Sequence, residues 1–209
     1  MHIDAASIIL IGIFLLVAFP VHEFFHAYAA YRLGDGTAKM FGRLTLNPAV
    51  HFDPLGGLLL IVSVLSSGFV FGWAKPTPVN PSNLRDRRNS EVIVALAGPA
   101  SNLVMACVAA LVFRALQATG VLIQLPEVAV LVLFDFVLFN ILLAIFNMIP
   151  IPPLDGSTLL WRFLPPQTVW QWRPILSQYG FIILLVFIFT IGRYVAGVVY
   201  DVTSFLVGF

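Results

Sequence analysis

The stretch that decides the fold is residues 20–33, PVHEFFHAYAAYRL. It contains the pattern His-Glu-x-x-His, in which His22 and His26 are four residues apart and on a helix project from the same face. Two imidazoles placed in this way can share one metal ion, while Glu23 beside them can face a water molecule. The preceding residues 4–21 carry a single charge and predict a membrane-spanning helix. The sequence therefore predicts a metal site inside a bilayer.

The composition of the chain also predicts a membrane protein. Of its 209 residues, 60% are hydrophobic and 10% are charged, which is unlike a soluble domain. A net charge of +1, with scattered Lys and Arg, gives no reason to expect a nucleic-acid partner. The single cysteine, Cys107, excludes a disulfide framework within the chain. We expect an all-α polytopic membrane protein with residues 1–209 in one membrane-embedded domain.

Long apolar stretches predict about four transmembrane helices. The first covers about residues 5–33, is kinked by Pro20 and is retained rather than cleaved, because residues 1–7 lack a basic segment. In this helix His22 lies roughly 15 Å and His26 roughly 9 Å from the charge of Arg32. The later stretches are about 91–118, 127–149 and 175–209, the last preceded by a polar aromatic connector over 161–174.

Two shorter segments determine the predicted topology. Residues 37–50 alternate weakly and predict short strands or an extended loop at the interface. Residues 55–72 contain glycine and serine breakers and favour a re-entrant hairpin over a full span. With such a hairpin, Arg114 stands opposite most of the other cations, and the positive-inside rule makes their side cytoplasmic. The cations on that side are Arg32, Lys39, Arg43, Lys75, Arg85, Arg87, Arg88, Arg162 and Arg173.

A catalytic zinc ion needs a third protein ligand and an open position for water. The chain has only two further histidines, His2 and His51, so a carboxylate is the expected ligand. Asp155 is the best candidate, because prolines before it open the backbone at the end of the 127–149 helix. Asp135 is the competitor, but about twenty residues upstream it should lie toward the opposite leaflet.

Five segments together carry a family resemblance. HEFFH, NPAVHFDPLGG, GWAKPTPVNP, ALAGPASN and FNMIPIPPLDG occur in this order over roughly residues 15–160. The chain resembles the site-2 protease family, the zinc metalloproteases that cut within membranes, and especially its small prokaryotic branch without a PDZ domain. The resemblance does not cover residues 175–209, whose role stays unassigned.

The resemblance implies a role for each residue that matches a family motif. The zinc ligands, one ion per chain, would be His22, His26 and Asp155, and Glu23 would be the general base. Asn147 would hold the substrate backbone or the oxyanion. Asn102 occupies the position of a polar residue that lines the same cavity.

Three polar residues outside these motif positions have open roles. His51 either lines the path of substrate access or forms an interfacial pair with Asp53. Arg193, within the last apolar stretch, either extends to the membrane interface or pairs with Asp201.

These observations predict a zinc-dependent intramembrane endopeptidase. It would hydrolyse a peptide bond within or near the transmembrane segment of a membrane-protein substrate, in the cell membrane, with its active site toward the cytoplasm. The alternative is a membrane carrier or channel for divalent cations, which needs polar residues through the far leaflet. The far halves of the first two helices are almost wholly apolar, so a continuous cation path is poorly supported. A protein that binds metal without catalysis is a third possibility, although every expected catalytic residue is present.

Overall fold

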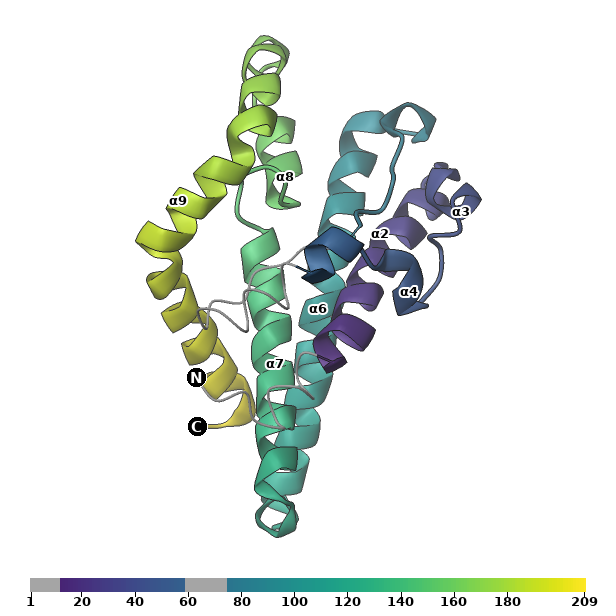
Figure 1. Ribbon diagram of the computed structural model, residues 1–209. Helices are drawn as coiled ribbons and strands as arrows, with labels where there is room; N and C mark the ends of the chain where they lie inside the picture. Colours follow the sequence, from purple (N-terminus) through teal and green to yellow (C-terminus); the bar gives the residue numbers. More distant parts are fainter. Residues whose placement is uncertain (1–11, 59–74) are drawn as a thin grey trace.

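The computed structural model describes residues 12–58 and 75–209, which are mostly helical (Figure 1). Within them, α6, α7 and α9 are long and apolar enough to cross a membrane. The start of the predicted first helix and most of the predicted hairpin at 55–72 lie outside the described residues. The elements are η1 (Phe14–Ala18), α2 (Phe19–Arg32), α3 (Thr37–Met40), α4 (Pro48–His51), η2 (Pro81–Asn83), α6 (Arg87–Ala118), η3 (Leu122–Gln124), α7 (Glu127–Asn147), α8 (Gly156–Phe163) and α9 (Pro166–Val207).

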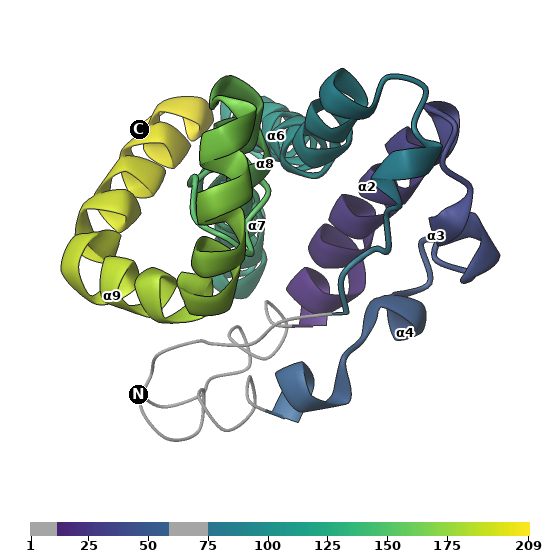
Figure 2. The same ribbon diagram turned by 90° about the horizontal axis from the view of Figure 1, so that it is seen from above.

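The longest helices form a bundle around α6. On one side α6 packs against α2, and on the other it packs against α7, which in turn contacts α9 (Figures 1 and 2). The short α8 returns from the end of α7 to contact α6. This arrangement brings residues near 20, 100 and 155 to one region of the bundle.

The apolar core lies in the second half of α6. Phe113 is 1% exposed and is surrounded by side chains of α7 and α9. Small residues on α6 let the neighbouring backbones approach closely, as is common between helices in membranes. The buried members of this core are Ala106, Ala109, Ala110, Phe113, Leu122, Val137, Ile141, Val199 and Val207.

The helix that carries the His-Glu-x-x-His motif contains a π-helical turn. Residues 12–32 are helical throughout, and η1 ends directly before α2, in which Pro20 is the second residue. Proline lacks the N–H that an α-helical turn requires, and its ring collides with the preceding turn. The wider turn lies where Pro20 interrupts the hydrogen-bond ladder, and the kink expected at this proline stays a prediction.

The prediction of short strands in residues 37–50 was wrong. The described part of the chain contains no strand there and instead forms the single-turn helices α3 and α4. Asn47 caps α4 by accepting a hydrogen bond from the Ala49 N–H at 3.1 Å, and Pro48 occupies its first turn. Proline in the first turn and asparagine at the cap favour a helix start, and this local chemistry outweighs the weak alternation.

The helix that contains the last apolar stretch begins before that stretch does. The expected connector at 161–174 is largely helical, because α8 continues to Phe163 and α9 begins at Pro166. At 42 residues, α9 would extend about 63 Å if straight, twice the hydrocarbon thickness of a bilayer. Instead it follows an arc (Figure 2). The first turns of α9, residues 166–174, precede its apolar part, which begins at about residue 175.

One end of the bundle is rich in arginine. The start of α6 lies at the same end as α8 and the first turns of α9 (Figure 1). Arg114, near the end of α6, is about 40 Å from Arg87 along the helix axis. The arginines of the first end are Arg87, Arg88, Arg162 and Arg173.

Candidate metal centre

Three side chains converge on one point between α2 and the start of α8. The Nε2 atoms of His22 and His26 are 3.0 Å apart. Each lies 3.3 Å from Oδ2 of Asp155. All three residues are at least half buried, and the region has the composition of a metal site. The two histidines come from adjacent turns of α2, whereas the carboxylate comes from a segment more than 120 residues later.

These separations fit a tetrahedral zinc site. Zinc bonds of about 2.0–2.2 Å to nitrogen and oxygen place neighbouring ligand atoms about 3.3–3.6 Å apart in a tetrahedron. The observed 3.0, 3.3 and 3.3 Å are close to this edge length. Three ligands leave the fourth corner open, which is typical of catalytic rather than structural zinc.

The hydrogen bonds of the two imidazoles also favour a cation at this point. Nδ1 of His26 donates to the Val94 carbonyl at 2.7 Å, and Nδ1 of His22 donates to Oδ1 of Asn102 at 2.6 Å. With hydrogen on both Nδ1 atoms, each neutral ring has a lone pair on Nε2. These two lone pairs face each other and the carboxylate of Asp155. Oδ2 of Asp155 is buried and accepts no hydrogen bond from the described residues. A bound cation satisfies all three atoms.

A chain of amides fixes the orientation of His22. Nδ2 of Asn102 donates to Oδ1 of Asn140 at 3.0 Å, and Nδ2 of Asn140 donates to the Phe136 carbonyl at 2.8 Å. Because a backbone carbonyl can only accept, the last bond sets the direction of both amides and leaves the Asn102 oxygen facing His22. Both asparagines are fully buried. The chain therefore holds His22 in the tautomer that directs Nε2 toward Asp155.

Gly98 on α6 makes room for the histidine rings. A Cβ atom at this position would lie 2.3 Å from Nε2 of His26 and 2.7 Å from Cε1 of His22. No side chain fits at such distances. The following residue, Pro99, lies within α6, and its missing N–H interrupts the helical ladder close to the Val94 carbonyl that binds His26.

Asp155 stands at the N-cap of α8 but does not cap it. Aspartate at this position commonly accepts a hydrogen bond from the first turn of its helix. Here it makes no such bond, and its Oδ2 faces the histidines instead. The loop before it is packed against α9, because a Cβ on Gly180 would lie 2.3 Å from the Pro152 carbonyl oxygen.

Glu23 lies beside the three candidate ligands and is held by the segment before α6. The Thr77 N–H donates to Oε2 of Glu23 at 2.9 Å, and the Thr77 hydroxyl donates to the same oxygen at 2.7 Å. Glu23, Asn147 and the three candidate ligands line one cavity of about 340 Å³. Within this cavity, Asn147 is fixed by a hydrogen bond from Nδ2 to the Leu143 carbonyl at 3.0 Å.

The structure separates the other candidates from this cavity. Asn102 contacts His22 rather than lining the cavity, and half-buried Asp135 is not part of the ligand cluster. His51 is buried and bonds through Nε2 to the Thr45 carbonyl at 2.8 Å, whereas Asp53 accepts from backbone N–H groups. Arg193 lies over the Tyr194 ring, 5.7 Å from its centroid. His2 lies outside the described residues.

Sequence analysis missed three residues that support the site, namely Gly98, Asn140 and Thr77. Gly98 and Thr77 lie in the segments ALAGPASN and GWAKPTPVNP, which carry the family resemblance. Their contacts with the histidines and with Glu23 are visible only in the structure. Asn140 carried a signal that was overlooked, because a lone amide inside an apolar span needs a polar partner.

Comparisons with known proteins give consistent names. A relative from Bacillus subtilis, named "Putative zinc metalloprotease YwhC", is 39% identical over 187 residues, which are 87% of this chain and 81% of the relative. "Putative zinc metalloprotease Rip2" of Mycolicibacterium smegmatis is 33% identical over 86% of this chain and 69% of its own length. Rip2 of Mycobacterium tuberculosis H37Rv is 32% identical over 88% and 69%.

Two other comparisons give no match. No family model matches the chain, and no solved structure matches it. The assignment to a family therefore rests on the relatives, whose alignments cover more than four fifths of this chain. The three long apolar helices indicate a membrane protein, and by its likeness to these relatives the chain belongs to the zinc metalloprotease family represented by YwhC and Rip2.

Proposed function

We propose that this protein is a zinc-dependent intramembrane endopeptidase of the site-2 protease type. It hydrolyses a peptide bond within or near the transmembrane segment of a membrane-protein substrate. The observation that carries the proposal is the cavity shared by the ligand cluster and Glu23. Gly98, against the histidines, is about 16 Å along α6 from Arg87. Because the hydrocarbon core of a bilayer is about 30 Å thick, this depth lies within it.

The chain's own residues supply positioning and proton transfer. Zinc, when bound, lowers the pKa of a water to roughly 7 and polarises a carbonyl. Glu23 accepts the proton of the attacking water and returns it to the leaving amine. The two Thr77 hydrogen bonds hold one carboxylate oxygen of Glu23 in place. Asn147, in the same cavity, holds the substrate backbone or its developing oxyanion.

Substrate and water must both reach this site. The amides of a substrate helix are already paired, so the helix has to unwind locally before a carbonyl reaches the cavity. Water is expected to enter from the arginine-rich end of the bundle, where the cavity is also lined by Arg173 and Pro81. By the positive-inside rule, we assign this end to the cytoplasmic side of the cell membrane.

A carrier for divalent cations is not favoured. Beyond Asn102 and Asn140, the described bundle continues into the apolar core around Phe113. A cation crossing this region would lose its hydration without polar ligands to replace it, which is costly. Relatives named as metalloproteases also favour hydrolysis.

The test is replacement of the proposed general base. Glu23→Gln keeps the size of the side chain but removes its basicity, so zinc should remain at one ion per chain while cleavage of a co-expressed single-span substrate is lost. Asp135→Asn is the matched control, because it makes the same carboxylate-to-amide change outside the cavity and should cleave normally. Cleavage by Glu23→Gln at the wild-type rate would refute the proposed function. Membrane proteomics of cells carrying either variant would identify the proteins that accumulate uncut.

A further inference from the structure

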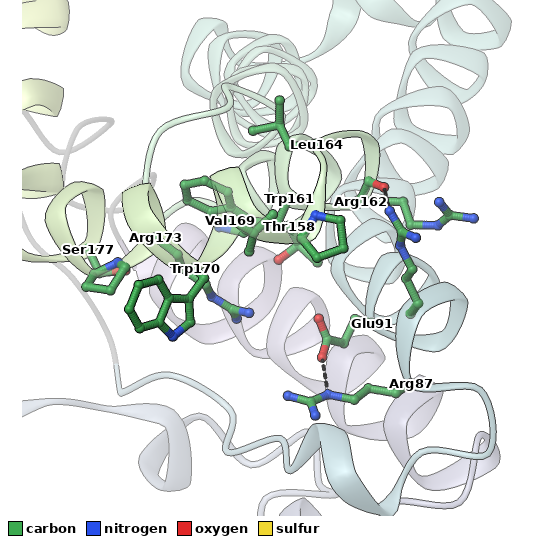
Figure 3. Close-up of a pocket in the computed structure, with 13 residues that line it drawn as sticks. Arg87, Glu91, Thr158, Trp161, Arg162, Leu164, Val169, Trp170, Arg173 and Ser177 are labelled. Carbon is green, nitrogen blue, oxygen red and sulfur yellow. Dashed lines mark hydrogen bonds and ion pairs between the residues drawn. The ribbon is translucent and has the colours of Figure 1, made fainter.

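A second cavity lies at the arginine-rich end of the bundle. It has a volume of about 610 Å³ and is formed by the first turns of α6, by α8 and by the first turns of α9 (Figure 3). It shares Glu91, Thr158 and Arg173 with the cavity of the metal centre but contains none of the candidate ligands. The proposed hydrolysis therefore gives this second cavity no role.

The charges around this cavity are strongly unbalanced. Four arginines and one carboxylate line it, so their sum is 4 − 1 = +3. Within the described part of the chain, Glu91 forms an ion pair with one arginine, Arg87, whose Nε lies 3.5 Å from Oε1 of Glu91. The starts of α6 and α9 place the positive ends of two helix dipoles at this cavity, and the end of α8 places one negative end there. The cavity therefore favours an anion.

Arg88 and Arg162 donate hydrogen bonds to neutral acceptors, and the exposed carboxylate of Asp86 also interacts electrostatically with Arg162. Arg162 donates through Nε and Nη2 to Oδ1 of Asn89 at 3.1 and 3.0 Å. Arg88 donates to the Arg162 carbonyl at 2.8 Å, which brings α6 and α8 together. Arg173 has no hydrogen-bond or ion-pair partner within residues 12–58 and 75–209. Glu91 and Asp86 offset part of the positive charge, at Arg87 and Arg162, and an oxyanion between the guanidinium groups would offset the remaining repulsion.

The lining of the cavity is apolar beside the arginines. Trp161 is buried at the α8 side, and Trp170 is 80% exposed and lies beside Arg173 (Figure 3). Leu164 and Val169 extend this surface. Tryptophan and arginine are the side chains that favour the boundary between lipid headgroups and acyl chains. A free phosphate ion would use the arginines but not this apolar surface.

We propose that this cavity binds the phosphate of an anionic phospholipid headgroup, with the adjoining glycerol and acyl carbons against Trp161 and Trp170. Basic pockets between transmembrane helices commonly take such headgroups. An acidic segment of a protein substrate fits the charge but is less favoured, because cytoplasmic flanks of membrane spans are enriched in Lys and Arg. The lipid would occupy the space next to the metal cavity without taking part in hydrolysis.

The experiment measures lipid binding to the purified full-length protein in a neutral detergent, by native mass spectrometry. Phosphatidylglycerol is compared with phosphatidylcholine, with inorganic phosphate and with a soluble glutamate-rich peptide. The expected result is one tightly held phosphatidylglycerol per chain. In Arg173→Gln and Arg162→Gln this binding should weaken about tenfold, as expected for loss of one charged hydrogen bond.

Arg85→Gln is the matched control, since it removes one positive charge two residues before the start of α6 but outside the lining of the cavity. It should bind phosphatidylglycerol as the wild type does. Arg173→Lys keeps the charge and should retain more binding than Arg173→Gln, which separates loss of the site from misfolding. Unchanged zinc content and elution volume show that each variant is folded.

Three results would overturn the proposal. Equal binding of phosphatidylglycerol and phosphatidylcholine would show that the arginines do not select charge. Equal binding of inorganic phosphate would show that the apolar surface is not used. Binding of the acidic peptide that depends on Arg173, without binding of phosphatidylglycerol, would assign the cavity to a protein partner. None of these measurements depends on cleavage activity, so the test stands apart from that of the proposed function.

Discussion

The two halves of α6 contact their neighbours in different ways. Around Gly98 and Asn102, α6 meets α2 through imidazole and amide groups that are buried and hydrogen-bonded. From Ala106 to Phe113 it meets α7 and α9 through apolar side chains alone. Buried polar groups are costly in a membrane unless each is satisfied, whereas packed apolar groups stabilise the bundle. The first half should therefore determine metal binding and the second half stability.

The largest effect is expected from Gly98→Ala in the polar half. The added methyl group would lie 2.3 Å from Nε2 of His26, so the ligand must move. Zinc affinity should fall by about 100-fold or more, approaching the loss caused by Asp155→Ala. Zinc content after dialysis against a chelator measures this. Gly197→Ala on α9, where nothing lies within 4 Å, should keep full zinc, and equal retention by both variants would contradict the comparison.

Phe113→Ala tests the apolar half. Its cavity should cost about 2 kcal/mol of unfolding free energy, less than in a water-soluble core, because the apolar bilayer supplies no transfer term between water and protein. Thermal unfolding in detergent measures the loss. Zinc stoichiometry should stay at the wild-type value. A Phe113→Ala protein that unfolds normally but loses zinc would reverse the proposed division.

Asn140→Leu tests where the polar half ends. It removes the acceptor of Asn102 at 3.0 Å and so loosens the amide that holds His22. We expect about tenfold weaker zinc binding, the lower end of the effect for residues that support a ligand. A double substitution with Asn102→Leu should cost little more than Asn102→Leu alone, because both act through one chain. Fully additive losses would show that Asn140 acts independently.

The smallest effect concerns Asp35, outside the spans. Burial alone would raise the pKa of this carboxyl, but hydrogen bonds from Thr37, Asn83 and the Asn80 N–H outweigh it and lower the pKa below its usual value. A carboxyl with a depressed pKa stabilises the fold above its unfolded pKa, and the effect is lost as pH falls through the folded pKa.

Asp35→Asn should therefore destabilise the protein by about 1 kcal/mol at neutral pH and by progressively less below pH of about 4. Unfolding in detergent across this range measures the difference between wild type and variant. A difference that stays constant with pH would show that the charge of Asp35 is irrelevant.

How much was predictable depended on the range of the interaction. The i, i+4 spacing of the histidines and the Leu-Asp-Gly motif are visible in the sequence, and the structure brings His22, His26 and Asp155 together. The cap at Asn47 was also visible, but weak alternation was preferred, and the result was a wrong prediction of strands. The contacts of Thr77 with Glu23 join segments 54 residues apart, and no local pattern encodes them. Likewise, the prolines Pro165 and Pro166 indicate a break in the chain, but the sequence alone did not show that a helix begins at this point.

The close approach of Gly180 to Pro152 couples metal binding to the docking of α9. Two ligands lie on α2, whereas Asp155 follows the loop that α9 contacts. Zinc held by the three candidate ligands would require that loop to be in place, so its binding free energy would also stabilise the docked position of α9. By the same linkage, a change on α9 alters zinc affinity from outside the cavity. The last helix, for which the sequence motifs gave no role, thereby becomes part of the thermodynamics of the metal centre.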